Sequence, residues 1–206
     1  MSRGVPVYFF RCSTGIPVKV TEITFHAGCH ATLVVEIPET EAFNTAERPH
    51  LPRILFRLLP RIASQHCNND EGHSFRREAQ STEIPHLFEH MIIEIQDQVR
   101  RGVGIPFRGE TRWNWTVDPR GRFHVTVEYD HEMVALGAIR LAERMINAID
   151  SREIASLDMN REIRRLREIA KLSRRSTSHR RELLGESSQK EEGAGTDPTP
   201  SVNEDD

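Results

Sequence analysis

Two histidines near the middle of the chain have a spacing that suits a metal site. His86 and His90 are four residues apart, and residues four apart on a helix point to the same side. Two imidazoles on one side can hold a divalent cation such as zinc between them. Glu89 directly precedes the second histidine, where its carboxylate could take a proton from a water bound to that cation. These three residues are the first candidates for chemistry.

Together they form the pattern H-x-x-E-H, which is typical of the inverted zinc-peptidase helix. Apolar side chains recur at helical spacing through the same stretch, from Leu87 to Val99, and predict an amphipathic helix. An ordinary amphipathic helix whose polar face carries histidines is the alternative interpretation. The five residues alone do not decide between the two.

Strands and helices are predicted on both sides of this helix. A capping residue, Thr82, precedes it, and glycines at 102 and 104 end it. Residues 65–80 are polar and predict a loop. Strand patterns cover 5–10, 18–25, 32–37, 111–117 and 123–129, and helical patterns cover 51–62, 131–149 and a third helix through 163–172. We therefore expect an α/β (α+β) fold with an antiparallel-rich sheet packed by helices.

Composition limits the class of protein. The net charge of −3 gives no overall electrostatic reason to bind nucleic acid, and no apolar run approaches the length that spans a membrane. The three cysteines are widely spaced and odd in number, which favours a reducing compartment and predicts a cytoplasmic protein. Residues 1–175 are predicted to form one domain, and residues 176–206 a disordered polar tail. The oligomeric state is left open, and a homodimer is compatible with the sequence.

Several stretches resemble the N-terminal domain of cyanophycin synthetases over about residues 50–172. They are Leu59-Pro-Arg-Ile62, His66-Cys67, the helix 86–96, Val127-Glu-Tyr129 with Glu132, and Leu166-Arg-Glu-Ile-Ala170. The resemblance implies a compact α/β domain with a layout like that of the inverzincin metallohydrolases. In some family members it also implies a metal-dependent hydrolytic site that cuts the β-Asp-Arg polymer into primers.

The chain also departs from the synthetases that it resembles. Those proteins continue into an ATP-grasp domain with a Gly-Pro-Ser-Thr stretch after the third helix, whereas residues 173–177 here read Ser-Arg-Arg-Ser-Thr. No glycine loop suited to cradle phosphates is present in the sequence. We therefore expect an N-domain that stands alone and does not polymerise.

The expected metal ligands are His86, His90 and Glu132, with Zn²⁺ or another divalent metal between them. The resemblance places a glutamate at position 132, and a catalytic zinc usually has three protein ligands and one open position. Glu94 and Glu128 are the alternatives, either as ligands or as groups that orient a histidine. Arg112, Tyr129 and His131 are candidates by position for contacts to an oxyanion or substrate.

The function expected from these residues is that of a metal-dependent peptidase. Glu89 would act as general base, and the substrate would be a peptide or isopeptide, such as a cyanophycin-like polymer. Two other functions stay open. The same fold could bind a peptide or polymer without catalysis, or the basic helix 161–181 could contact an acidic partner.

Overall fold

The computed structural model describes residues 18–39, 42–67, 74–101 and 104–183. By its internal contacts the chain divides into two compact units, residues 1–173 and 174–206. The strand expected at 5–10 and residues 184–206 of the expected tail lie outside the described residues. The last helix continues to Leu183, beyond the position 176 at which the tail was expected to begin.

The sheet has four strands in the order β1-β2-β4-β3, and every neighbouring pair is antiparallel. This confirms the expected α+β class. Apolar residues alternate with polar ones along β2 and β4 and are buried at every second position, as in a sheet with one face on the core. The strands are β1 (Lys19–His26), β2 (His30–Glu36), β3 (Gly109–Arg112) and β4 (Arg122–Glu128).

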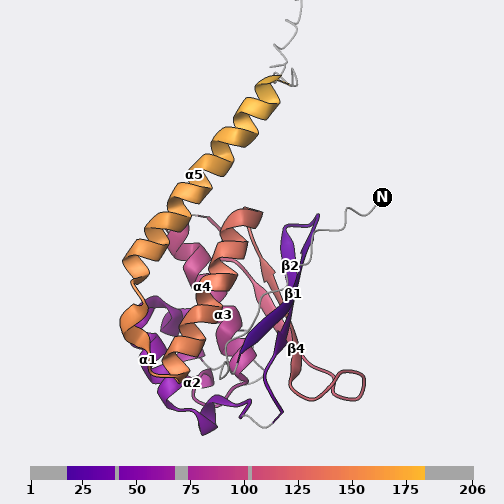
Figure 1. The fold of residues 1–206 in the computed structure, drawn as a ribbon, viewed down its shortest axis with the longest axis vertical. Helices are drawn as coiled ribbons and strands as arrows, with labels where there is room; N and C mark the ends of the chain where they lie inside the picture. Colours follow the sequence, from indigo (N-terminus) through magenta and orange to yellow (C-terminus); the bar gives the residue numbers. More distant parts are fainter. Residues whose placement is uncertain (1–17, 40–41, 68–73, 102–103, 184–206) are drawn as a thin grey trace, which may run out of the picture. The chain divides into compact units, whose positions relative to one another are not determined.

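Three of the longer helices, α1, α3 and α4, lie on the same side of the sheet (Figure 1). The α-helices are α1 (His50–Leu58), α2 (Phe75–Glu78), α3 (Ile84–Val99), α4 (Glu132–Asp150) and α5 (Met159–Leu183). Short 3₁₀ helices are η1 (Thr45–Glu47), η2 (Pro60–Ser64) and η3 (Ile154–Ser156). α1 ends at Leu58, and Pro60 is the first residue of η2, a position where its missing N–H is tolerated.

Helix α3 is the centre of the core. It contacts α4, β3, β4 and η2, so it is covered on nearly every side. Its apolar residues from Ile84 to Ile95 are buried, but so are Glu89, His90, Glu94 and Gln96, which are 4%, 3%, 2% and 2% exposed. Because a buried polar group without a hydrogen bond is costly, each of these side chains needs a partner inside the protein. Those partners determine the chemistry of the helix.

Three local expectations differ from the structure. The N-cap of α3 is Glu83 rather than Thr82, whose hydroxyl contacts a histidine instead. The strand expected over 111–117 ends at Arg112, because Asn114 accepts hydrogen bonds from the backbone of residues 116–118 and turns the chain. The segment 65–80, which was expected to be a loop, contains the short helix α2. It begins directly after the end of η2.

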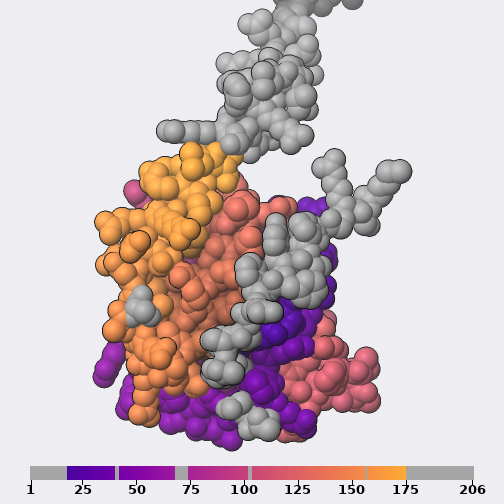
Figure 2. Space-filling model, viewed as in Figure 1, coloured from indigo at the N-terminus to yellow at the C-terminus, as the bar shows by residue number. Residues whose placement is uncertain are grey.

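The connection between β3 and β4 projects from the edge of the sheet, and Val117 in it is 80% exposed (Figures 1 and 2). Among the helices of the described segments, none combines the length and the apolar character needed to cross a membrane.

Candidate metal centre

His86 lies in the first turn of α3 and is half-buried. Its Nδ1 atom lies 2.7 Å from the hydroxyl of Thr82, four residues earlier. Its Nε2 atom lies 3.4 Å from the sulfur of Cys67. Burial lowers the pKa of His86 below its usual value. The ring is thus held at both nitrogens and favours the neutral form that a metal ligand requires.

His90 lies one turn further along the helix, with its ring centroid 5.0 Å from that of His86. Phe75 of α2 stacks on it at a centroid distance of 3.6 Å. Burial, with a smaller contribution from the neighbouring His86, lowers the pKa of His90 to about 3. Packing therefore fixes the plane of this ring as well as its neutral state.

A chain of hydrogen bonds decides which nitrogen of His90 carries the proton. Gln65 donates from Nε2 to the carboxylate of Glu94 at 3.2 Å, and its Oε1 lies 2.7 Å from Nδ1 of His90. Since a carboxylate accepts, the amide of Gln65 must present its oxygen to the histidine. Nδ1 of His90 is then the donor, and its Nε2 keeps a lone pair for a metal. Glu94 thus acts on the histidine through Gln65.

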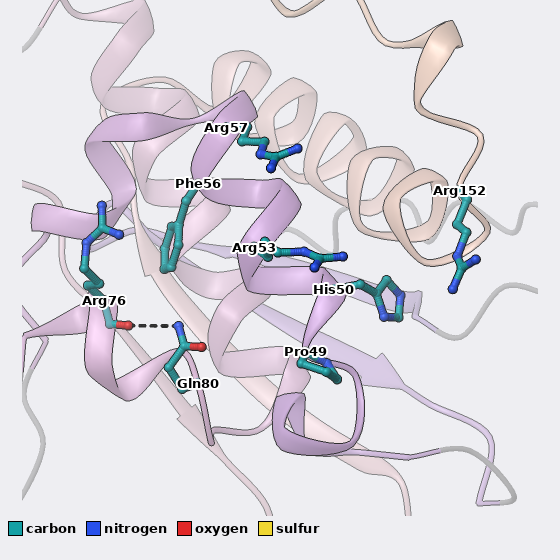
Figure 3. A pocket seen from close by; sticks show the side chains of 8 residues that line it. All are labelled: Pro49, His50, Arg53, Phe56, Arg57, Arg76, Gln80 and Arg152. Carbon is teal, nitrogen blue, oxygen red and sulfur yellow. Dashed lines mark hydrogen bonds between the residues drawn. The ribbon is translucent and has the colours of Figure 1, made fainter.

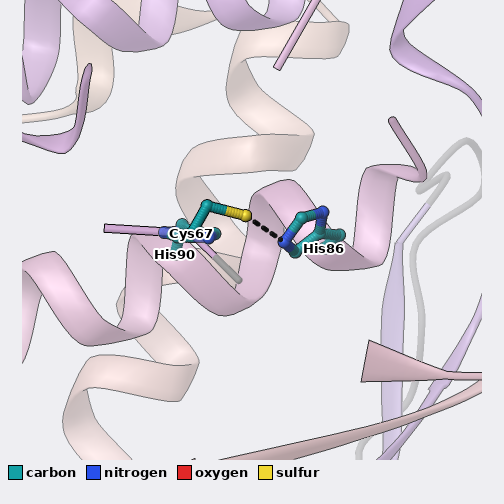
Figure 4. Close-up of side chains that lie close together, drawn as sticks. All are labelled: Cys67, His86 and His90. Atoms are coloured by element: carbon teal, nitrogen blue, oxygen red, sulfur yellow. Dashed lines mark hydrogen bonds between the residues drawn. The ribbon is translucent and has the colours of Figure 1, made fainter. Parts of the chain in front are cut away.

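Cys67 completes a group of three side chains that could hold a metal ion (Figure 4). The thiol and the two imidazoles offer one ligand atom each, and all three atoms lie within 4.8 Å of one another. Zinc bonds of about 2.3 Å to sulfur and 2.0 Å to nitrogen at a tetrahedral angle separate the two donors by about 3.5 Å. The observed 3.4 Å between Cys67 and His86 matches this. The residues fit zinc, because thiolate and imidazole are its usual ligands.

The structure does not place a carboxylate in this group. No aspartate or glutamate within the described segments joins the cluster of Cys67, His86 and His90. Glu132 is the exposed first residue of α4, close to Tyr129. Glu128 is exposed and accepts a hydrogen bond from the backbone N–H of Arg108 at 2.9 Å. The third donor beside the histidines is therefore a cysteine rather than any of the expected glutamates.

Glu89 faces the sheet. Thr111 of β3 donates its hydroxyl proton to the Glu89 carboxylate at 2.6 Å. A Cβ atom at Gly109 would lie 2.6 Å from the same carboxylate, so only glycine leaves room for it. Burial raises the pKa of Glu89 to about 7, against the opposing effect of the Thr111 hydrogen bond. The histidines, by contrast, face Gln65, Cys67 and Phe75.

The three candidates for oxyanion contacts take part in other interactions. Arg112 is exposed and pairs with Glu110 at 2.6 Å. The hydroxyl of Tyr129 donates to the carbonyl of His26 at 3.2 Å, and burial raises its pKa. His131 is the N-cap residue of α4. None of these contacts connects the residue to the cysteine–histidine group.

Sequence reasoning missed the roles of Cys67, Gln65, Thr82 and Phe75. Cys67 appeared only as part of a family resemblance, and Thr82 as a helix cap. The available signal was chemical, because a cysteine and two histidines within twenty-four residues are a donor set that zinc prefers. Gln65 and Phe75 carry no such signal, because neither glutamine nor phenylalanine is a usual zinc ligand.

Comparison with known proteins agrees with the resemblance. Residues 32–151, more than half of the chain, match the family described as "Cyanophycin synthase-like N-terminal domain". The chain belongs to this family. The matched region contains all three members of the cluster, together with the sheet strands β3 and β4 and the whole of α4.

A curated relative, cyanophycin synthetase from Geminocystis herdmanii (strain PCC 6308), is 30% identical over 105 residues. The alignment covers 50% of this chain but 11% of the relative. The chain therefore spans about a ninth of the length of that protein.

These findings correct the expectation of a metal-dependent peptidase. The matched family and the relative are named for a synthetase, and neither is named for a peptidase. The geometry gives a physical reason for the error. The H-x-x-E-H pattern assumes that the glutamate stands beside the metal, whereas the hydroxyl of Thr111 and the space over Gly109 hold Glu89 on the sheet side of α3.

Proposed function

We propose that this chain is a zinc-holding domain that binds a peptide or polymer strand without cleaving it. One observation carries the proposal: the three donors Cys67, His86 and His90 converge, while the nearby carboxylate of Glu89 is bonded to Thr111. Metal-assisted hydrolysis needs a base within reach of the metal-bound water. Zinc ligands without that base favour a structural or binding role.

Cys67, His86 and His90 would hold the zinc, and in doing so would tie the segment after η2 to the first turns of α3. When bound, the zinc supplies one coordination position beyond its three protein ligands, which an oxygen of an outside ligand can take. The protein's own contribution is orientation. Thr82, Gln65 and Phe75 fix the two imidazole rings before any metal arrives.

The family supports a polymer as the ligand. The relative is named cyanophycin synthetase, so a cyanophycin-like β-Asp-Arg polymer is the ligand that we propose for this chain. A thiol that must remain available for zinc also needs reducing conditions. We therefore propose that the chain works in the cytoplasm.

The first experiment is elemental analysis of untagged protein beside Cys67→Ser and His86→Ala/His90→Ala variants. We expect about one zinc per chain in the wild type and little in the variants, because each loses at least one of three ligands. Cys29→Ser is the matched control, since Cys29 is exposed and forms no part of the cluster. Wild-type protein without zinc, even after zinc is added back, would refute the metal centre.

The second experiment mixes the zinc-loaded protein with insoluble β-Asp-Arg polymer and sediments the mixture. We expect protein in the pellet and polymer of unchanged length after long incubation. Protein that stays in the supernatant would refute polymer binding. Shortened polymer would refute the claim that the strand is not cleaved, provided that the Cys67→Ser variant shortens it less.

Two basic residues in the described part of α5 make contacts within the chain, which does not favour a second function. Arg167 donates to the backbone carbonyl of Gln98 at 2.7 Å, and Lys171 pairs with Glu168 at 2.7 Å. Such contacts are those of a helix surface with its own counter-charges rather than of a nucleic-acid site.

A further inference from the structure

A second site is formed by four arginines that surround one open pocket, here called the arginine pocket. The arginines are Arg53 and Arg57 of α1, Arg76 of α2, and Arg152 in the turn after α4. The pocket has a volume of about 810 Å³. Figure 3 shows the four side chains around it, with Arg152 reaching it from a segment far from α1 and α2 in the sequence.

Among the described residues, no carboxylate neutralises the four arginines of the pocket. None of its lining residues is acidic, and in the part of the chain that the structure describes no ion pair joins any of the four arginines to a carboxylate. Asp150 lies 3.4 Å from the lining residue His50, but Arg48 binds its carboxylate at 2.6 Å. Arginine stays charged at every physiological pH. Four cationic groups therefore face one space.

Arg152 holds a backbone conformation that is unfavourable for arginine. Its φ angle is +63°, in the left-handed region where glycine is the usual residue after a helix. The turn is closed by hydrogen bonds from the N–H of Arg152 to the carbonyl of Ile149 and from Glu153 to Ala148. Glycine would form the same turn with less strain, so the presence of arginine at this position suggests a role for its side chain.

The N-terminus of α1 adds to the positive potential. Pro49, its N-cap residue, lines the pocket and makes no side-chain capping bond, and the first turn of α1 has no acidic residue. The partial positive charge of the helix end is thus open toward the pocket. His50 is the first residue of the helix and also lines the pocket.

We propose that the arginine pocket binds an acidic peptide segment that carries several carboxylates along an extended chain. The cationic groups come from three separate segments and are spread over a wide pocket, so they fit several anionic groups better than one phosphate. Each guanidinium can bind a carboxylate through two parallel hydrogen bonds. A nucleic acid fits less well, because Arg76 already covers the aromatic ring of Phe56 at 5.2 Å and blocks base stacking there.

This proposal for the arginine pocket rests on the proposed function in one respect, namely that the protein binds a peptide or polymer strand. The pocket itself contains none of the zinc-binding residues. Peptide binding at the pocket and zinc-dependent polymer binding can therefore succeed or fail separately.

The test is binding of fluorescent hexa-aspartate to the full chain by anisotropy at low and high salt. We expect saturable binding that weakens as salt rises, because the contacts are ionic. Arg53→Gln/Arg57→Gln should weaken it by at least about tenfold, since each lost charged contact is worth roughly that factor. The matched control is Arg161→Gln/Arg165→Gln, which removes two exposed arginines at the same spacing from α5 and should change the affinity by less than about twofold.

A second pair of variants separates binding from folding. Arg152→Gly removes a cation from the pocket but relieves a left-handed conformation, so thermal stability should hold or rise while hexa-aspartate affinity falls about fivefold or more. Arg101→Gly is its control, because Arg101 has φ +61° and lies outside the pocket. It should match the stability change and leave the affinity unchanged.

Several results would overturn the proposal. These are equal losses of affinity in the α5 variant and the pocket variant, an Arg152→Gly variant that binds like the wild type, or tripolyphosphate or single-stranded DNA that binds more tightly than hexa-aspartate. Polymer that sediments wild-type and pocket variants equally, with no hexa-aspartate binding, would refute the pocket and leave the proposed function standing. Hexa-aspartate binding that the pocket variants abolish, without any polymer binding, would support the arginine pocket and refute polymer binding.

Discussion

The two sides of helix α3 both bury ionisable groups, but they do so in different ways. On one side, His86 and His90 lie close to Cys67, and Gln65 is hydrogen-bonded both to the carboxylate of Glu94 and to His90. On the other side, Glu89 meets a single hydroxyl, that of Thr111, over the bare backbone of Gly109. The first side brings three donor atoms within 4.8 Å of one another. The second side satisfies one carboxyl group locally.

This difference shows that burial alone does not identify a site. Burial shifts the pKa of groups on both sides of the helix, lowering that of His90 to about 3 and raising that of Glu89 to about 7. In each instance burial favours the uncharged form. Only the cysteine–histidine side brings several donor atoms to one point, and convergence is what a metal requires.

The largest expected effect is the loss of thermal stability when zinc is removed from the cysteine–histidine side of α3. A ligand that binds only the folded state at 100 times its dissociation constant stabilises that state by about 2.7 kcal/mol, and at 1,000 times by about 4.1 kcal/mol. We therefore expect a chelator to lower the melting temperature of wild-type protein clearly. The Cys67→Ser variant should melt at the same temperature with and without chelator. Equal chelator effects in both proteins would mean that zinc acts elsewhere.

The next effect is a loss of stability caused by a change on the sheet side of α3, which should not alter the zinc content. In Gly109→Ala the new methyl group would lie 2.6 Å from the Glu89 carboxylate, so the side chain or β3 must move. Overpacking of this kind costs about 1–3 kcal/mol. We expect a lower free energy of unfolding by chemical denaturation, with an unchanged zinc content. The double variant Gly109→Ala/Glu89→Ala removes the clashing carboxylate and should regain part of the loss.

Much of the fold could be predicted from local patterns in the sequence. Alternation predicted β2 and β4, and helical spacing predicted α3 and α4. The short span of β3 could not be read from the alternation of residues 111–117, because the side chain of Asn114 turns the chain within it.

The candidate site was harder to predict, because its members come from separate segments. Helical spacing predicted that His86 and His90 lie on the same side of one helix. The placement of Cys67 depends on how the segment after η2 packs against α3, which is a tertiary contact with no local pattern. The side of Glu89 depends on Gly109 and Thr111, about twenty residues later. The motif therefore located the two candidate histidines but not the side chains around them.

A smaller effect tests the relay behind His90. Gln65→Leu keeps the size of the side chain but removes the acceptor for Nδ1 of His90. Loss of such an orienting partner typically lowers metal affinity about 10–100-fold. Gln98→Leu is the matched control, since Gln98 also donates to Glu94, at 2.8 Å, but has no hydrogen bond to a histidine. Competition with a coloured zinc chelator should show the loss for Gln65→Leu, and equal losses in the two variants would mean that Glu94 acts without the relay.

The smallest expected effect is that of Glu89→Gln, and it examines whether the two sides of α3 are independent. The amide oxygen of glutamine can still accept the hydrogen bond that Thr111 now gives to the carboxylate, and the buried group is then neutral at every pH. Because a protonated carboxyl and an amide differ little in shape, the free energy of unfolding near pH 7 should stay within about 1 kcal/mol of the wild type. Zinc affinity should be unchanged, since the carboxylate does not belong to the cluster. A variant that folds normally but loses zinc would join the two sides into one site, and the glutamate would then have to reach the metal in a conformation that Thr111 and Gly109 do not hold.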